Sequence, residues 1–341
     1  MTEVAAAPSK VGPELERELE QHRRELTAYS YRMLGSAFEA EDAVQETMVR
    51  AWRSVDRFEG RSSLRSWLYR IATNVCLDML DGRNRRARPM DIGTEGTGEG
   101  PLGDVLPESV WLQPMPDGRV LAPETDPAEL AVQRESIRLA FMAALQHLPA
   151  RQRVVLILRE VLRWKADEVA ALLGSSVASV NSALQRARAT MDASGLTPSD
   201  VVEPEDNDQR ELLARYLEAF ESYDLDALTA LLAKDATLSM PPYPLWMRGP
   251  ENIRQWMLGV GSVCRGSRLV PTVANGSPAF GHYHPAPDGG YAAWALQVIE
   301  VNDGKIVALN SFLDAAVLFP LFGLPMRLEE GAALPHAGEE G

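Results

Sequence analysis

The chain has 341 residues, of which 45% are hydrophobic and 24% charged, and its formal net charge is −14. This length predicts two or three domains, and the composition excludes a chain that is disordered throughout. The two cysteines, Cys76 and Cys264, lie far apart, which argues against a disulfide framework and against a zinc ligand set. No apolar stretch predicts a signal peptide or a membrane span, so we expect a cytoplasmic protein with no membrane partner.

The charge is distributed unevenly along the chain. Residues 50–88 and 131–199 carry net charges of +6 and +4, whereas residues 14–49, 89–130 and 200–341 carry −5, −8 and −11. The total of −14 argues against a nucleic-acid partner, but the two basic blocks permit local contacts to phosphates.

Helix is predicted over two stretches in the first 191 residues of the chain. Residues 14–88 place apolar side chains at three- and four-residue spacing, and the loop over residues 58–63 offers serines that can cap the next helix. Residues 89–127 are rich in glycine, proline and acids, which is the composition of a linker. Helical spacing returns over residues 128–191, and a second linker is predicted over residues 192–207.

After residue 208 the pattern changes to that of an α+β domain. Two helices come first, and residues 292–301 then predict a strand with apolar side chains on both faces. Asn302, Asp303 and Gly304 predict a hairpin turn into a strand over residues 306–313. Helices followed by a meandering sheet indicate a separate domain.

The strongest local motif is EVAALLGSSVASVNSAL (residues 168–184), whose spacing predicts a helix-turn-helix. Gly174 permits the positive φ that ends the first helix, and Ser176 can cap the second. A helical hairpin that binds no DNA stays open from this motif alone. The outer face of the second helix offers polar side chains to a major groove, namely Asn181, Ser182, Gln185, Arg186 and Arg188.

Three motifs in order resemble the sigma-70 family, in particular its compact extracytoplasmic-function (ECF) group. They are EDAVQETMVRAW (residues 41–52), FEGRSSLRSWLYRIATN (residues 58–74) and LPARQRVV (residues 148–155) followed by the helix-turn-helix. The resemblance covers about residues 14–192. It implies an alternative sigma factor that binds core RNA polymerase, at its beta-prime clamp and beta flap, and promoter DNA.

Each motif is given a role by this resemblance. The first implies a core-polymerase-binding helix with Asp42, Gln45, Glu46, Arg50 and Trp52 at the contact, although a solvated face stays open. The third implies that the outer face of the helix-turn-helix reads the −35 element. This face carries fewer basic residues than is usual in the family. The second implies recognition of the −10 element by Phe58, Arg61, Trp67, Arg70 and Asn74.

The helical wheel agrees with the −10 role. Trp67, Arg70 and Asn74 share one flank of a helix, which places an aromatic plane, a cation and an amide together. Unstacked bases stack on aromatic side chains, and an amide reads a base edge. A core role for Trp67 stays open.

Residues 208–320 resemble the SnoaL-like, cone-shaped α+β fold, which usually holds a pocket. The candidate pocket residues are Trp246, Tyr283, Trp294 and Asp314, with a core role open for the aromatics. His282 and His284 fall on one strand face, but no third ligand is evident, so we predict neither a metal site nor a cofactor.

The predicted protein is therefore multidomain, with two all-α sigma domains joined by a flexible linker and a C-terminal α+β cone that modulates activity. No catalytic residue is expected; a one-component regulator and a protein with a cyclase- or isomerase-like tail stay open. An anti-sigma factor or a small-molecule ligand of the tail is a possible further partner. The predicted segments are residues 14–90 (region 2), 91–128 (acidic linker), 129–192 (region 4), 193–207 (linker) and 208–325 (SnoaL-like domain).

Overall fold

The computed structural model describes residues 13–58, 60, 62–100, 102–122, 126–193 and 207–329. The chain forms two compact units: Met1–Arg85 with Gly118–Ser199, and Arg86–Asp117 with Asp200–Gly341. Among the described residues, no helix is both long and apolar enough to cross a membrane. The predicted 193–207 linker lies outside the described residues except at its two ends.

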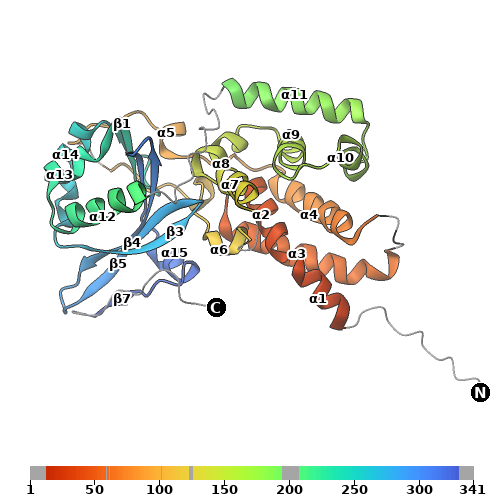
Figure 1. The fold of residues 1–341 in the computed structure, drawn as a ribbon, viewed down its shortest axis with the longest axis horizontal. Coiled ribbons are helices and arrows are strands. Elements are labelled where there is room, and N and C mark those ends of the chain that lie inside the picture. Colours follow the sequence, from red (N-terminus) through yellow and green to blue (C-terminus); the bar gives the residue numbers. More distant parts are fainter. Residues whose placement is uncertain are drawn as a thin grey trace, which may run out of the picture. The chain divides into compact units, whose positions relative to one another are not determined.

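The first unit is built from helices (Figure 1). Before the break at residue 86 these are α1 (Pro13–Gln21), α2 (Arg23–Leu34), α3 (Ala37–Ser54), the 3-10 turn η1 (Val55–Arg57) and α4 (Leu64–Leu80). After residue 117 they are α6 (Asp117–Val120), α7 (Pro127–Glu135), α8 (Leu139–Gln146), α9 (Ala150–Leu156), the π-helical turn η3 (Ile157–Val161), α10 (Ala166–Leu173) and α11 (Val177–Ala193).

Local capping sets the ends of these helices, as the sequence predicts. Ser63 accepts a hydrogen bond from the backbone nitrogen of Ser66 at 3.1 Å and caps α4. Gly174 adopts φ +59° at the end of α10, and Ser176 accepts from the nitrogen of Ser179 at 3.2 Å. The predicted helix-turn-helix is therefore confirmed.

A buried cation joins the two helical segments of this unit. Arg153 of α9 is 4% exposed, and its guanidinium donates to the carbonyl oxygens of Met33, Gln146 and Leu148 and to the Gln146 side chain. Burial lowers the pKa of Arg153 to about 10. Met33 belongs to α2, so this one side chain connects helices more than a hundred residues apart in sequence.

Replacing Arg153 with methionine should destabilise this unit by about 3 kcal/mol, because several buried carbonyls lose their donor at once. Urea denaturation followed by helical circular dichroism measures the change. Arg151→Met is the matched control, since Arg151 lies in the same helix but is exposed. Equal stability of the two variants would show that the buried hydrogen bonds contribute nothing.

The second unit combines a sheet with helices. Its helical elements are α5 (Pro89–Ile92), η2 (Glu108–Val110), α12 (Asn207–Glu221), α13 (Leu225–Ala230), α14 (Pro250–Leu258), η4 (Val260–Cys264) and α15 (Ala315–Leu321). Its strands are β1 (Leu232–Ser239), β2 (Trp246–Arg248), β3 (Arg268–Ala274), β4 (Ser277–Pro285), β5 (Tyr291–Asn302), β6 (Lys305–Phe312) and β7 (Arg327–Leu328).

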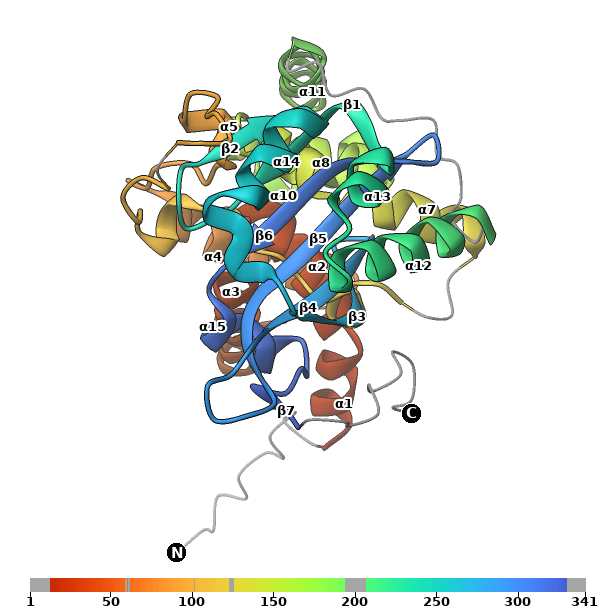
Figure 2. The same cartoon turned by 90° about the vertical axis from the view of Figure 1, so that its left-hand side faces the viewer.

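The sheet has the order β2-β1-β6-β5-β4-β3, and β7 pairs with β5. The β1–β6 pair is parallel and the other neighbours are antiparallel. The predicted hairpin is confirmed: Asn302 pairs with Lys305, and Asp303 and Gly304 both have positive φ. Helices α12, α13 and α14 lie across one face of the sheet (Figure 2) and enclose its apolar core there.

The acidic segment at residues 86–117 differs from the expected flexible linker, because it packs within the second unit. The indole nitrogen of Trp246 donates to the carbonyl of Gly93 at 3.0 Å, and the Gly96 nitrogen donates to the carbonyl of Trp246 at 2.8 Å. Asn275 exchanges two hydrogen bonds with the backbone of Met115 at 2.9 and 3.0 Å.

Glycines explain why this segment packs although its composition is that of a linker. A Cβ atom added to Gly98 would lie 2.6 Å from the carbonyl oxygen of Asn252 and 2.9 Å from the nitrogen of Trp256. The backbone therefore approaches α14 more closely than any other residue allows. Glycine in this segment provides close contact as well as chain flexibility.

Candidate functional site

The described residues expected to contact the −10 element are Phe58, which precedes α4, and Trp67, Arg70 and Asn74 within α4. The rings of Phe58 and Trp67 lie 5.0 Å apart and are tilted by 36°. Both side chains are half-buried, whereas Arg70 and Asn74 further along α4 are exposed. Arg61 lies outside the described residues.

This arrangement presents an aromatic pair beside a cation and an amide, a set that can stack bases and read one base edge. Arg70 is engaged within the unit, since its Nη2 donates to the carbonyl oxygen of Ala171 in α10 at 3.2 Å. Nearby, the rings of Tyr69 and Trp164 lie 5.1 Å apart. Part of the α4 surface therefore faces the residues that form and precede the helix-turn-helix.

The residues expected to contact core polymerase share the exposed face of α3. Asp42, Gln45, Glu46, Arg50 and Trp52 are all exposed, while Ala40, Ala43, Val44, Thr47 and Ala51 are buried. Arg50 pairs with Glu46 at 2.7 Å and with Asp78 of α4 at 3.3 Å, and the Glu46 hydrogen bond raises the pKa of Arg50 most. Trp52 is 51% exposed, which is unusual for a tryptophan and marks a surface suited to a partner.

The helix-turn-helix directs the outer face of α11 to solvent, while Val180, Leu184 and Ala187 are buried. Asn181, Gln185, Arg186 and Arg188 are exposed and Ser182 is half-buried. Two of these side chains already have partners: Arg186 donates to Ser182 at 2.7 Å, and Arg188 pairs with Glu160 at 2.5 Å. Asn181 and Gln185 are the exposed amides of this face.

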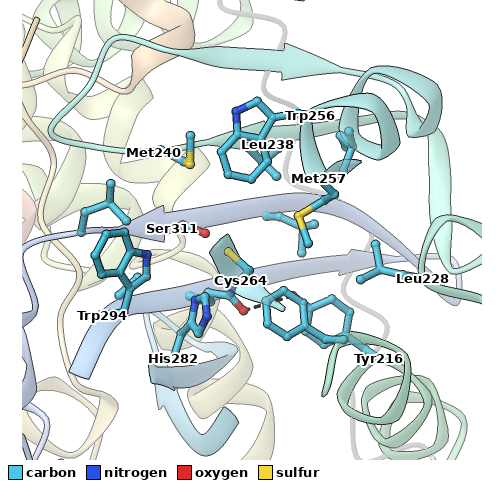
Figure 3. Close-up of a pocket in the computed structure, with 16 residues that line it drawn as sticks. Tyr216, Leu228, Leu238, Met240, Trp256, Met257, Cys264, His282, Trp294 and Ser311 are labelled. Carbon is cyan, nitrogen blue, oxygen red and sulfur yellow. Dashed lines mark hydrogen bonds between the residues drawn. The ribbon is translucent and has the colours of Figure 1, made fainter. Parts of the chain in front are cut away.

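The second unit contains a cavity of about 40 Å³ between the sheet and the covering helices (Figure 3). Apolar side chains dominate its lining, together with a few polar groups. Among these polar groups, the Tyr216 hydroxyl donates a hydrogen bond to the side-chain oxygen of Gln297 at 3.1 Å. The lining residues are Tyr216, Phe220, Leu228, Leu238, Met240, Ile253, Trp256, Met257, Cys264, His282, Trp294, Ala295, Gln297, Leu309, Ser311 and Leu313.

Of the four predicted pocket residues, Trp294 lines this cavity and the other three do not. Trp246 binds the Gly93 carbonyl instead. Tyr283 points to the opposite face of β4, where it packs on Phe319 and donates to the carbonyl of Pro325. Asp314 lies at the start of α15, where burial and the nearby Glu108 raise its carboxyl pKa. These three residues therefore lie outside this cavity. For Tyr283 the reason is that alternation along a strand cannot say which face the helices cover.

A cluster of two histidines and a cysteine forms part of this unit. Cys264 comes from η4 and the histidines from β4, and one ligand atom from each residue lies within 4.8 Å of the other two. His282 packs edge-on against Phe220 at 5.1 Å, and His284 stacks on Trp294 at 4.2 Å. Burial lowers the pKa of His284 to about 4 and that of His282 well below its usual value, and it raises the Cys264 pKa to about 12.

Sequence reasoning missed Cys264 as a member of this cluster. Eighteen positions separate it from His282, and no spacing motif joins a cysteine in a 3-10 turn to histidines on a strand. It also missed Arg153 as a buried connector, since a basic residue in a basic block predicts surface contact with phosphate.

The fold combines a helical unit that contains a helix-turn-helix with an added α+β domain. Residues 19–86 match the sigma-70 region 2 family, residues 138–191 match sigma-70 region 4, and residues 213–309 match the SnoaL-like domain family. ECF RNA polymerase sigma factor SigG of Mycobacterium tuberculosis is 44% identical over 314 residues, which are 90% of this chain and 82% of that protein. The chain therefore belongs to the ECF RNA polymerase sigma factors.

A second relative has a solved structure. ECF RNA polymerase sigma factor SigJ of the same organism is 30% identical over 86% of this chain and 89% of its own length. The crystal structure of SigJ aligns with a TM-score of 0.57 at 26% identity and covers 91% of this chain and 99% of that one. The predicted fold class, two helical sigma regions followed by a SnoaL-like domain, is confirmed.

Proposed function

We propose that this protein directs core RNA polymerase to its own set of promoters and performs no bond-breaking chemistry. The exposed face of α3 binds core polymerase at the beta-prime clamp, and region 4 contacts the beta flap. The α4 segment captures bases of the −10 element, and the outer face of α11 reads the −35 element. The protein acts in the cytoplasm, where core polymerase and promoter DNA are its partners.

One observation carries this proposal. In a chain of this family, α3 exposes a polar face that ends in the half-exposed Trp52. The same unit carries the half-buried Phe58–Trp67 pair, the exposed Arg70 and Asn74, and a helix-turn-helix. A regulator that acts only through DNA has no need of the α3 face.

Competition with a primary sigma factor tests the proposal. Labelled full-length protein should bind core polymerase with one-to-one stoichiometry, and an excess of primary sigma factor should displace it, because both occupy the same clamp. Simultaneous binding of both proteins, or no binding to core polymerase, would favour a one-component regulator instead.

Promoter binding requires the first unit to open. The −10 and −35 elements lie about 25 base pairs apart, or roughly 85 Å at 3.4 Å per base pair. Here Arg70 of α4 lies 3.2 Å from the backbone of α10, and Arg153 joins α9 to α2. Both contacts must break before α4 and α11 can reach their elements, so the structure represents a closed state of the proposed factor.

The C-terminal unit is proposed to modulate this opening, because residues 86–117 join the two sigma regions and pack against it. Holding this segment shortens the free chain between α4 and α7, which favours the closed state. A small-molecule ligand of the cavity, or a separate anti-sigma factor, would regulate the protein by changing how tightly this segment is held.

Gly98→Ala should release this segment and raise promoter output several-fold. The added methyl group clashes with Asn252 and Trp256, and such overpacking typically costs about 1–3 kcal/mol. A glutamate-specific protease should then cleave at Glu99 faster in Gly98→Ala than in the parent chain.

Gly100→Ala is the matched control for this change. A Cβ atom there lies 3.4 Å from its nearest neighbour, the carbonyl oxygen of Thr97, and φ is not positive. Unchanged protection and unchanged output in Gly98→Ala would contradict a regulatory role for the packed segment.

A further inference from the structure

The two histidines and the cysteine of the C-terminal unit have the chemistry of a metal site. Cys264, His282 and His284 place one ligand atom each within 4.8 Å of the others, although they come from two separate elements. Figure 3 shows Cys264 and His282 next to each other on the cavity wall. Cys264 is 5% exposed and His282 is 2% exposed, so these two members are shielded from bulk water, whereas His284 is half-buried.

We propose that the C-terminal unit binds one Zn²⁺ ion through the Cys264 sulfur and one ring nitrogen each of His282 and His284. Imidazole and thiolate are ligands that zinc prefers, whereas Mg²⁺ and Ca²⁺ prefer oxygen. Tetrahedral zinc with bonds of about 2.0–2.3 Å places its ligand atoms about 3.3–3.6 Å apart. The ligand atoms must therefore come closer together by roughly 1 Å on binding.

Unpaired polar atoms at the cluster support this assignment. The Nε2 atoms of both His282 and His284 are buried and have no hydrogen-bond partner. Burying a polar group without a partner is costly, and such groups call for a specific explanation. A coordinated ion would explain both unpaired nitrogens, because the lone pair of a neutral imidazole binds the ion.

Two of the three proposed ligands, Cys264 and His282, line the cavity, so a fourth ligand can reach the ion from there. Three protein ligands leave one tetrahedral position open, as in zinc sites that bind a water or another small ligand. The cavity of about 40 Å³ has room for a coordinated water. On binding, the Cys264 thiol becomes a thiolate and its proton passes to solvent, so the positive charge of the ion replaces that of the proton.

The packing around the histidines limits their motion. Phe220 holds the His282 ring edge-on and Trp294 stacks on the His284 ring, so the two rings are oriented by neighbours in advance of binding. Trp294 is 42% exposed and His284 is half-buried, so this side of the cluster lies nearest to solvent. This inference concerns the C-terminal unit alone and does not depend on the proposed promoter function.

Metal titration of the full-length chain tests the assignment. Zn²⁺ should bind with one-to-one stoichiometry, and Co²⁺ used as a probe should give a thiolate-to-cobalt charge-transfer band that Zn²⁺ abolishes. At a free Zn²⁺ concentration of about 100 times Kd, the unfolding midpoint of the C-terminal unit should rise by about 5 °C or more.

Three variants make the test specific. Cys264→Ser should remove the charge-transfer band, and Cys264→Ser and His284→Gln should each weaken Zn²⁺ binding by about 100-fold or more, since loss of an outer partner alone costs 10- to 100-fold. Cys76→Ser is the matched control, because Cys76 is also buried and its pKa is likewise raised to about 12, yet it lies in the first unit. Cys76→Ser should keep both the band and the affinity.

Two results of the zinc titration would overturn the assignment, and a third would come from the same titration with Cu⁺. One is binding that survives unchanged in both ligand variants, which would mean that Zn²⁺ binds elsewhere on the acidic surface. The other is no saturable binding by a chain whose circular dichroism shows it to be folded. Retention of Cu⁺ at the same residues with rejection of Zn²⁺ would likewise overturn it and assign the site to copper.

Discussion

Replacing Asn74 with alanine should reduce transcription directed by this protein about 5- to 150-fold without destabilising it. The exposed amide follows Trp67 and Arg70 on one flank of α4, where it can make a paired hydrogen bond to a base edge. Such a contact discriminates by about 1–3 kcal/mol, which gives the expected range. Alanine also favours the helix by about 0.5 kcal/mol, so any loss of output cannot come from unfolding. Run-off transcription at saturating core polymerase measures the effect.

The matched control for this change is Asn84→Ala. Asn84 is also an exposed asparagine in region 2, but it lies beyond the end of α4 and outside the flank that carries Trp67. It should retain full output. Equal output from Asn74→Ala and Asn84→Ala would remove Asn74 from the proposed −10 contact.

Trp52→Ala should weaken binding to core polymerase about 30-fold or more. Large aromatic side chains that a partner buries commonly contribute at least 2 kcal/mol to an interface. Half of the Trp52 surface is already in solvent, so truncation removes little packing within the unit. Fluorescence anisotropy with labelled protein measures the dissociation constant directly.

Leu258→Ala provides the comparison for Trp52. Leu258 is 54% exposed against 51% for Trp52, and it lies in α14 of the C-terminal unit. Its removal should leave core polymerase affinity within two-fold of the parent, by the same argument that a solvent-exposed side chain without a partner contributes little. A loss of affinity as large as that of Trp52→Ala would mean that exposure alone, and not the α3 face, explains the effect.

Local patterns predicted most of the fold. The caps at Ser63 and Gly174 and the hairpin at Asp303–Gly304 follow from short-range chemistry, and each lies where the sequence indicates. The segment at residues 86–117 could not be predicted in the same way. Its composition indicates a solvated chain, and only the position of α14 and Trp246 in space explains why its glycines pack.

The candidate sites show the same division. The exposed face of α3 and the flank of α4 follow from helical periodicity, because burial of one face determines the other. The positions of Tyr283 and Cys264 could not be predicted in this way, because they depend on tertiary structure. For Tyr283 it matters which face of the strand the helices cover, and for Cys264 it matters which residue of a distant 3-10 turn approaches β4. Arg153 was similarly hidden, since its partners are backbone carbonyls, which carry no residue-type signal.

As an ECF sigma factor, this chain should give core RNA polymerase a promoter specificity. Purified full-length protein, core polymerase and a fragmented genomic library in a run-off selection test it most directly. We expect initiation at a discrete set of start sites that share −10 and −35 elements, with output sharply reduced in Asn74→Ala and Trp52→Ala. Transcription no different from that of core polymerase alone, at every fragment in the library, would contradict it.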